Sequence, residues 1–133
     1  MPSFSTRSKA ILSTVHPNLQ RIANIAILSS DFAVICGHRN KADQNKAFAG
    51  GYSKLQYPSS KHNSKPSTAI DLAPYSDGKI QWNDGRAFLE LAKLIQYVAH
   101  IEGIAIRWGG DFNSDGNFKN DRFVDMPHFE LVS

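Results

Sequence analysis

The sequence predicts an α+β domain in which helices pack against a small antiparallel sheet. Three observations predict it. Apolar residues recur at helical spacing in long stretches, they alternate in short ones, and 133 residues suffice for one hydrophobic core but not two. The last extended segments follow one another like a hairpin, which favours antiparallel pairing. We therefore expect one domain, residues 1–133, without repeats or linkers.

Three stretches have the pattern of helices. Residues 17–29 carry apolar side chains at helical spacing after a proline that suits a first turn. Residues 41–49 form a shorter helix that the following glycine pair should end. The longest helix begins at Asn83 or Asp84, which are both good N-caps, and ends just before Gly103.

Four stretches have the pattern of strands: residues 32–36, 68–72, 104–108 and 127–132. In the first, Cys36 continues the apolar alternation, so we expect it to be a small buried hydrophobe. In the second, alternation places Ile70 and Leu72 on one face and Asp71 on the other. A carboxylate carried in the middle of a strand is held rigidly.

The composition, with 41% hydrophobic and 20% charged residues, is typical of a globular protein. The net charge of +3 suits an anionic partner, and both a cell-wall polymer and a nucleic acid qualify. No apolar run approaches a membrane span, and residues 1–9 lack the hydrophobic core of a signal peptide. We therefore expect synthesis in the cytoplasm without self-export or stable membrane association.

The residues with the strongest chemical signal lie in SKHNSKPSTAID, 60–71, and DMPH, 125–128. His62, Asp71 and His128 supply three ligands typical of a catalytic zinc site, which keeps its fourth position open. Asp125 is the favoured general base for an attacking water. Glu130 is its rival, and it could instead orient a ligand imidazole from behind.

These motifs, S-x-H, A-x-D and acid-x-x-H, resemble the zinc metallopeptidases that group lysostaphin, the D-alanyl-D-alanine carboxypeptidases and hedgehog. The segments SKHNSKPSTAIDLAPY and IRWGGDFNSDGNFKNDRFVDMPHFEL are most similar to phage endolysins that cut the L-alanyl-D-glutamate bond of peptidoglycan. The resemblance spans residues 32–131. This chain departs from the common pattern by placing eight residues between the first His and the Asp, and by carrying Asp rather than Glu at position 125.

The resemblance implies a peptidase that acts on peptidoglycan stem peptides as a monomer. It places Arg39 near the scissile carbonyl, where a guanidinium would stabilise the developing oxyanion, and it places Gln44 and Ser60 near the substrate. Ser60 could equally order its own loop. As a phage lysin, the protein would stay in the host cytoplasm until another protein opens the membrane to the cell wall.

Two alternatives share this resemblance: a D-alanyl-D-alanine carboxypeptidase, and a wall-binding module of the same fold that has lost turnover. The presence of both Asp125 and Arg39 favours an enzyme. Nucleic-acid binding rests on charge alone, and we do not expect it.

A second metal site is suggested by residues 111–117, which reproduce the first half of a calcium loop. Arg122 stands where a bidentate Glu should close that loop, and an ordinary polar hairpin explains the same residues. Both readings stay open. The candidate calcium ligands are Asp111, Asn113, Asp115, Asn117 and Asp121.

Overall fold

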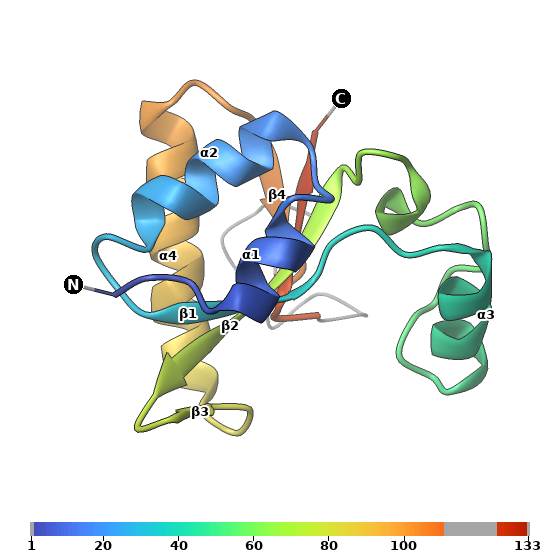
Figure 1. Ribbon diagram of the computed structural model, residues 1–133, viewed down its shortest axis with the longest axis horizontal. Helices are drawn as coiled ribbons and strands as arrows, with labels where there is room; N and C mark the ends of the chain where they lie inside the picture. The colour runs from blue at the N-terminus through green and yellow to red at the C-terminus, as the bar shows by residue number, and fades with distance from the viewer. Residues whose placement is uncertain (1, 111–124, 133) are drawn as a thin grey trace.

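The computed structural model describes residues 2–110 and 125–132 (Figure 1). The described helices are α1 (Thr6–Leu12), α2 (Pro17–Ala26), α3 (Lys41–Ala49) and α4 (Gly85–Ile101), with a 3₁₀ turn η1 at Lys61–Asn63. The described strands are β1 (Phe32–Cys36), β2 (Ala69–Ser76), β3 (Lys79–Ile80), β4 (Ile106–Trp108) and β5 (His128–Leu131). The sheet has the order β1-β2-β5-β4, with β3 paired to β2, and every pairing is antiparallel. The predicted α+β class is confirmed.

The predicted helices begin where their capping residues indicate. The Asp84 carboxylate accepts a hydrogen bond of 3.0 Å from the Ala87 amide at the start of α4, and Gly103 follows the end of that helix with a φ of 71°. Helix α3 has the predicted bounds, and α2 ends three residues earlier than predicted. Local capping chemistry therefore predicts the starts of these helices better than the end of α2.

One hydrophobic core joins the helical layer to one face of the sheet. Helices α2 and α4 pack against each other, and α4 also contacts β2 and β4 (Figure 1). The sheet contributes Ile70, Leu72 and Phe129, each at most 2% exposed. Full burial of such a side chain contributes roughly 1.5–3 kcal/mol. The predicted inward direction of Ile70 and Leu72 is confirmed.

Helix α1 and the short strand β3 were not predicted. In α1 only Ser8 and Leu12 are buried, so the sequence lacks an apolar stripe. The helix is instead tied to β1 by a polar contact, because the Ser8 hydroxyl accepts a hydrogen bond of 3.0 Å from the Val34 amide. Polar anchoring of this kind leaves no periodic signal.

The prediction that Cys36 is a buried hydrophobe is wrong. Phe32 and Val34 face the core, but the pairing of β1 with β2 shifts register between Val34 and Cys36. This irregularity turns Cys36 out of the alternation and leaves it half-buried opposite Asp71. Its sulfur therefore lies on the other face of the sheet.

Helix α3 and the chain that follows it extend away from the body of the molecule (Figure 1). The only buried side chain of α3 is that of Gln44, which is polar. None of the helices in the described part of the chain is long and apolar enough to cross a membrane.

Candidate metal and active site

The register of the strands places three reactive side chains in one row across the sheet. Asp71 on β2 pairs with Cys36 on β1 on one side and with His128 on β5 on the other. Residues two apart on a strand share a face, so Glu130 joins His128 while Phe129 between them enters the core. The face of the sheet opposite the core is thus polar and carries the site.

His62 reaches this row from the η1 turn. The Ser60 hydroxyl accepts a hydrogen bond of 3.1 Å from the His62 amide, and the Asn63 side chain accepts one of 3.0 Å from the Ser60 amide. This reciprocal pair is a capping box. The Arg39 amide also donates to the His62 carbonyl at 2.7 Å, which fixes the turn against the end of β1. Ser60 orders its own loop, and it also lines the pocket.

The inner atoms of His62, Asp71 and His128 form a nearly equilateral triangle. His62 Nε2 lies 3.1 Å from Asp71 Oδ1 and 3.2 Å from His128 Nδ1, and the last two atoms are 3.2 Å apart. Both imidazoles are buried. Three donor atoms therefore converge on one point.

The outer ring nitrogens determine which nitrogens face inward. His62 Nδ1 lies 2.7 Å from the Gly37 carbonyl oxygen, and His128 Nε2 lies 2.8 Å from Glu130 Oε1. A carbonyl and an ionised carboxylate can only accept, so both outer nitrogens carry a hydrogen. Each imidazole is then free to offer the lone pair of its inner nitrogen to a metal.

Gly37 allows this arrangement because it packs closely. A side chain at this position would collide with Thr14 and Val15. Glycine lets the backbone approach, so that its carbonyl meets the His62 ring.

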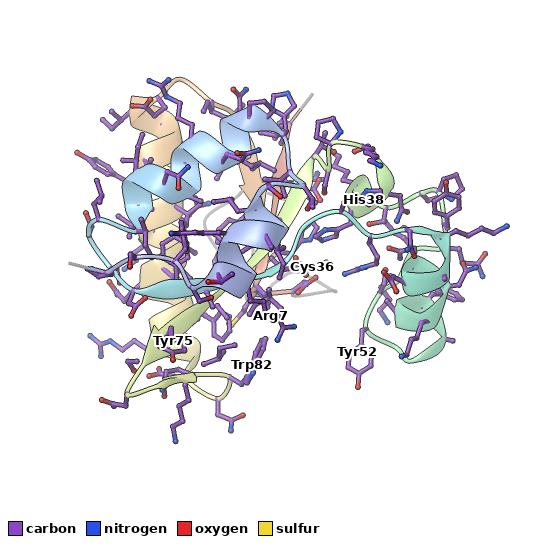
Figure 2. The ribbon with its side chains drawn as sticks, in the orientation of Figure 1. Arg7, Cys36, His38, Tyr52, Tyr75 and Trp82 are labelled. Carbon is purple, nitrogen blue, oxygen red and sulfur yellow. The ribbon has the colours of Figure 1, made fainter. Side chains whose placement is uncertain are left out.

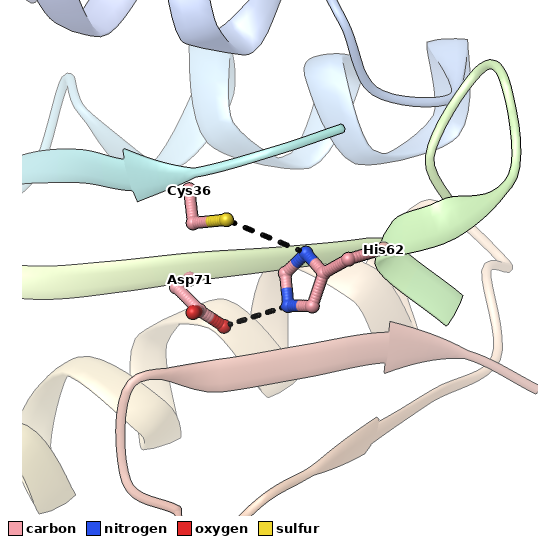
Figure 3. A group of neighbouring side chains, drawn as sticks. All are labelled: Cys36, His62 and Asp71. Carbon is pink, nitrogen blue, oxygen red and sulfur yellow. Dashed lines mark hydrogen bonds and ion pairs between the residues drawn. The ribbon is translucent and has the colours of Figure 1, made fainter. Parts of the chain in front are cut away.

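Cys36, His62 and Asp71 also form a group that could hold a metal ion (Figure 3). Their donor atoms lie within 4.8 Å of one another. Figure 3 shows Cys36 and Asp71 at opposite nitrogens of the His62 ring: the sulfur lies 3.8 Å from Nδ1, whereas the carboxylate meets Nε2. Cys36 therefore approaches the nitrogen that donates to Gly37.

Without a metal, the site strongly favours positive charge on its imidazoles. Burial lowers the pKa of His62, but the neighbouring Asp71 and Cys36 outweigh it and raise the pKa from 6.5 to about 10. Burial likewise opposes the charged form of His128, and hydrogen bonds to Asp71 and Glu130 raise its pKa to about 8. Burial of Asp71 would raise its pKa, but the two imidazoles hold it well below the usual range. The negative charge of Asp71 and Glu130 that raises these pKa values is also the charge that would attract a metal cation.

Asp125 lies beside the triangle at the start of a tight turn that leads into β5. Its amide donates to the Gly109 carbonyl at 2.8 Å, and its carbonyl accepts from the His128 amide at 3.0 Å. Gly109 is required here, because any side chain would collide with the Asp125 backbone. Burial, and then repulsion from Asp71, raise the pKa of Asp125 to about 6, although the nearby cations oppose this. Such a carboxyl can exchange protons near neutral pH.

Arg39 is fixed from three sides. Its Nη1 donates to Gln44 Oε1 at 2.9 Å, and its Nη2 lies 3.6 Å from Cys36 Sγ and 3.8 Å from Asp71 Oδ2. The guanidinium thus lies close to the triangle with its side chain 16% exposed.

Gln44 lies beneath Arg39, and the structure does not place it at the substrate surface as expected. It is fully buried, and its Nε2 donates to the Ser53 hydroxyl and the Leu55 carbonyl at 2.9 and 2.6 Å. Because both ends of the amide are engaged, Gln44 holds Arg39 and the chain after α3 together.

A pocket of about 690 Å³ opens over the site. It gathers the expected residues Arg39, Ser60, His62, Asp71, Asp125, His128 and Glu130. Sequence reasoning did not assign Lys61, Arg107 or the segment 52–55 to this pocket, since no metal-site pattern includes them. Tyr52 in that segment is 83% exposed and lies on the outer α3 region (Figure 2). The candidate calcium ligands at positions 111–121 lie outside the described residues.

Comparisons with known proteins point to one family. A family model described as phage L-alanyl-D-glutamate peptidase matches residues 2–132. The L-alanyl-D-glutamate peptidase of Escherichia phage T5 is 38% identical over 135 residues, covering 97% of each chain. The crystal structure of the L-Ala D-Glu endopeptidase ChiX from Serratia marcescens matches with a TM-score of 0.78 and 27% identity, covering 98% of this chain and 91% of that one.

Proposed function

We propose, from the premise that this chain belongs to the phage L-alanyl-D-glutamate peptidase family, that it holds zinc through His62, Asp71 and His128. The protein is a peptidase of the phage endolysin kind that hydrolyses the L-alanyl-D-glutamate bond of peptidoglycan. The zinc site and the roles below are our proposal. The observation that carries them is the triangle of donor atoms.

The triangle fits a zinc ion. Bonds of about 2.0–2.1 Å in a tetrahedral site require ligand atoms about 3.3 Å apart, and the three separations here are 3.1–3.2 Å. Two nitrogens and one carboxylate oxygen are a common donor set for catalytic zinc. The Gly37 carbonyl and Glu130 already hold the outer nitrogens, as ligand histidines require.

His128 is a better third ligand than Cys36. Its Nδ1 meets the same nitrogen of His62 that Asp71 meets, whereas Cys36 approaches the opposite nitrogen. One ion can therefore contact the inner atoms of His62, Asp71 and His128 at once. We assign Cys36 to the support of His62 and Arg39.

When bound, zinc supplies Lewis-acid chemistry and lowers the pKa of water to near 7. Asp125 takes the proton of the water that attacks the scissile carbonyl and passes it to the leaving nitrogen. In the metal-free protein burial and Asp71 raise its pKa to about 6, and a carboxyl group at this place can both accept and return a proton. Glu130 is less suited to this role, because His128 and Arg107 lower its pKa to about 2 despite its burial.

Arg39 stabilises the oxyanion that develops as water adds to the carbonyl. Its guanidinium lines the pocket beside Asp71 and is held in one orientation by Gln44. A preorganised cation stabilises developing charge without reorganising. Glu130 and Gln44 act as positioning residues for His128 and Arg39.

The same proposal covers where the enzyme works. We infer that it acts as a monomer on the cell wall after another protein has permeabilised the host membrane. Lysis should therefore follow permeabilisation and not expression alone.

Mass spectrometry of muropeptides released from purified cell wall tests the function. The enzyme should release stem peptides that begin with D-glutamate, and a chelator should stop this while added zinc restores it. Release of D-alanine alone would indicate a carboxypeptidase. Binding to the wall without any cleavage would indicate a non-catalytic module.

A further inference from the structure

The pocket contains a cation that the mechanism above does not use. Lys61 precedes His62 in the η1 turn, and its side chain, 36% exposed, lines the same pocket. Its Nζ reaches across to β5, where it donates to the Leu131 carbonyl at 2.6 Å. This ammonium is thus held at a fixed place beside the site.

Within residues 2–110 and 125–132, the charge of Lys61 is only partly neutralised. Its carboxylate neighbour is Glu130, whose Oε2 lies 3.4 Å away. Arg107 meets that same oxygen more closely, at 2.6 Å, and His128 takes the other carboxylate oxygen at 2.8 Å. Because Glu130 is engaged by stronger partners and Leu131 offers only a neutral carbonyl, Lys61 retains attraction for a second anion.

The substrate supplies such an anion. Glutamate has two carboxyl groups besides the nitrogen that the enzyme releases, and only one of them continues the stem peptide. The other stays ionised a few bonds from the scissile nitrogen. Any productive pose therefore brings a carboxylate into the pocket near the metal site.

We propose that Lys61 binds the free carboxylate of the D-glutamate residue and so selects this bond for cleavage. The proposal rests on the proposed function and adds a specificity-determining residue to it. Arg39 is a weaker candidate for this role, since its guanidinium is already shared among Gln44, Cys36 and Asp71. Lys61 Nζ, with three donors, can keep its bond to Leu131 and accept the substrate as a further partner.

Two peptides test the proposal directly. One is L-Ala-D-Glu-L-Lys joined through the glutamate γ-carboxyl, and the other is its amide, in which the free carboxylate is a neutral carboxamide of the same shape. One charge-assisted hydrogen bond changes kcat/KM by about 10- to 100-fold. We expect the wild-type enzyme to favour the acid peptide by that factor.

Lys61→Met removes the charge but keeps the length of the side chain. It should lower kcat/KM for the acid peptide to nearly the value for the amide and leave the amide rate almost unchanged. Lys61→Arg should keep most of the preference. Lys65→Met is the matched control, because Lys65 is an exposed lysine of the same loop that does not line the pocket, and it should keep the full preference.

The outcomes separate the two claims. Equal cleavage of both peptides by the wild type, or an equal loss on both in Lys61→Met, would overturn the role of Lys61 while the peptidase function stands. If the wild type cleaved neither peptide but released D-alanine from a complete stem peptide, the proposed function itself would fail. Cleavage of the amide by Lys61→Met at the wild-type rate shows that the variant is folded.

Discussion

The two faces of the central sheet differ in what they contribute. Toward the helices, Ile70 and Phe129 are almost completely buried in an apolar core. On the opposite face, their neighbours Asp71, which is half-buried, and His128, which is buried, belong to a cluster of ionisable groups that stabilise one another. One step along a strand separates the two, since side chains alternate.

This difference shows that the same strands provide both the rigid apolar core and the reactive groups of the site. Buried charges are costly unless they are paired, and the apolar face supplies the stability that allows such a cluster to persist. Substitutions on the core face should therefore change stability, and those on the site face should change chemistry. The predictions below test this separation, beginning with the largest expected effect.

Asp125→Asn should lower turnover by roughly 10²- to 10⁴-fold, because an amide cannot accept the proton of the attacking water. Kinetics on a stem-peptide substrate measure this loss. Zinc content and melting temperature should stay near wild type. Turnover within a few-fold of wild type would move the general base to another residue.

Phe129→Ala on the core face should cost about 3–5 kcal/mol in the free energy of unfolding, since it empties a fully buried aromatic position. Denaturant unfolding measures this cost. Val132→Ala, at a position that is 52% exposed, should change stability by less than about 0.5 kcal/mol. A similar small effect at Phe129 would contradict the division of the sheet into two faces.

Glu130→Gln should weaken zinc binding by about 10- to 100-fold, because His128 loses the carboxylate that orients its ring. Competition with a zinc chelator of known affinity gives the value. Glu90→Gln is the control, since Glu90 is an exposed carboxylate on α4. This variant should bind zinc with the affinity of the wild type. Unchanged affinity in Glu130→Gln would remove this residue from the support of the metal.

The smallest expected effect is a difference between the metal-free and the zinc-bound protein in how the melting temperature depends on pH. In the metal-free protein the pKa values of His62 and His128 are raised from 6.5 to about 10 and 8. Their contribution to stability is therefore complete below about pH 6.5 and is lost as the pH rises through 8 and then 10. Asp71 stays ionised throughout, because its pKa is lowered.

Zinc competes with these same protons, so its binding strengthens as pH rises. From about pH 6 to pH 9 the melting temperature of metal-free protein should fall, while the increase caused by saturating zinc should grow. Thermal denaturation of both forms tests this. Parallel pH curves for the two forms would show that zinc does not replace protons on the imidazoles.

The sequence predicted most of this arrangement where a local pattern existed. Helical spacing located α2 and α4, and alternation gave the opposite directions of Ile70 and Asp71. Contacts between distant segments leave no such pattern. The burial of Gln44 depends on Arg39, Ser53 and Leu55 together.

Cys36 shows a second limit of prediction from the sequence. Its alternation with Phe32 and Val34 indicated the core, and only the register shift against β2 turns it toward Asp71. Lys61 has no signal in the sequence beyond its charge, and its position at the pocket depends on η1 lying against β5. Irregular pairing and packing between loops set these features, and neither has a sequence period.

Zinc stoichiometry in two variants tests the central claim most directly. His128→Ala and Cys36→Ser each remove one candidate ligand from beside the shared pair, His62 and Asp71. We predict about one zinc per chain in wild type and in Cys36→Ser, and loss of zinc in His128→Ala, as measured by elemental analysis after dialysis. Full zinc in His128→Ala together with loss in Cys36→Ser would contradict the account and place the metal on the cysteine side of His62.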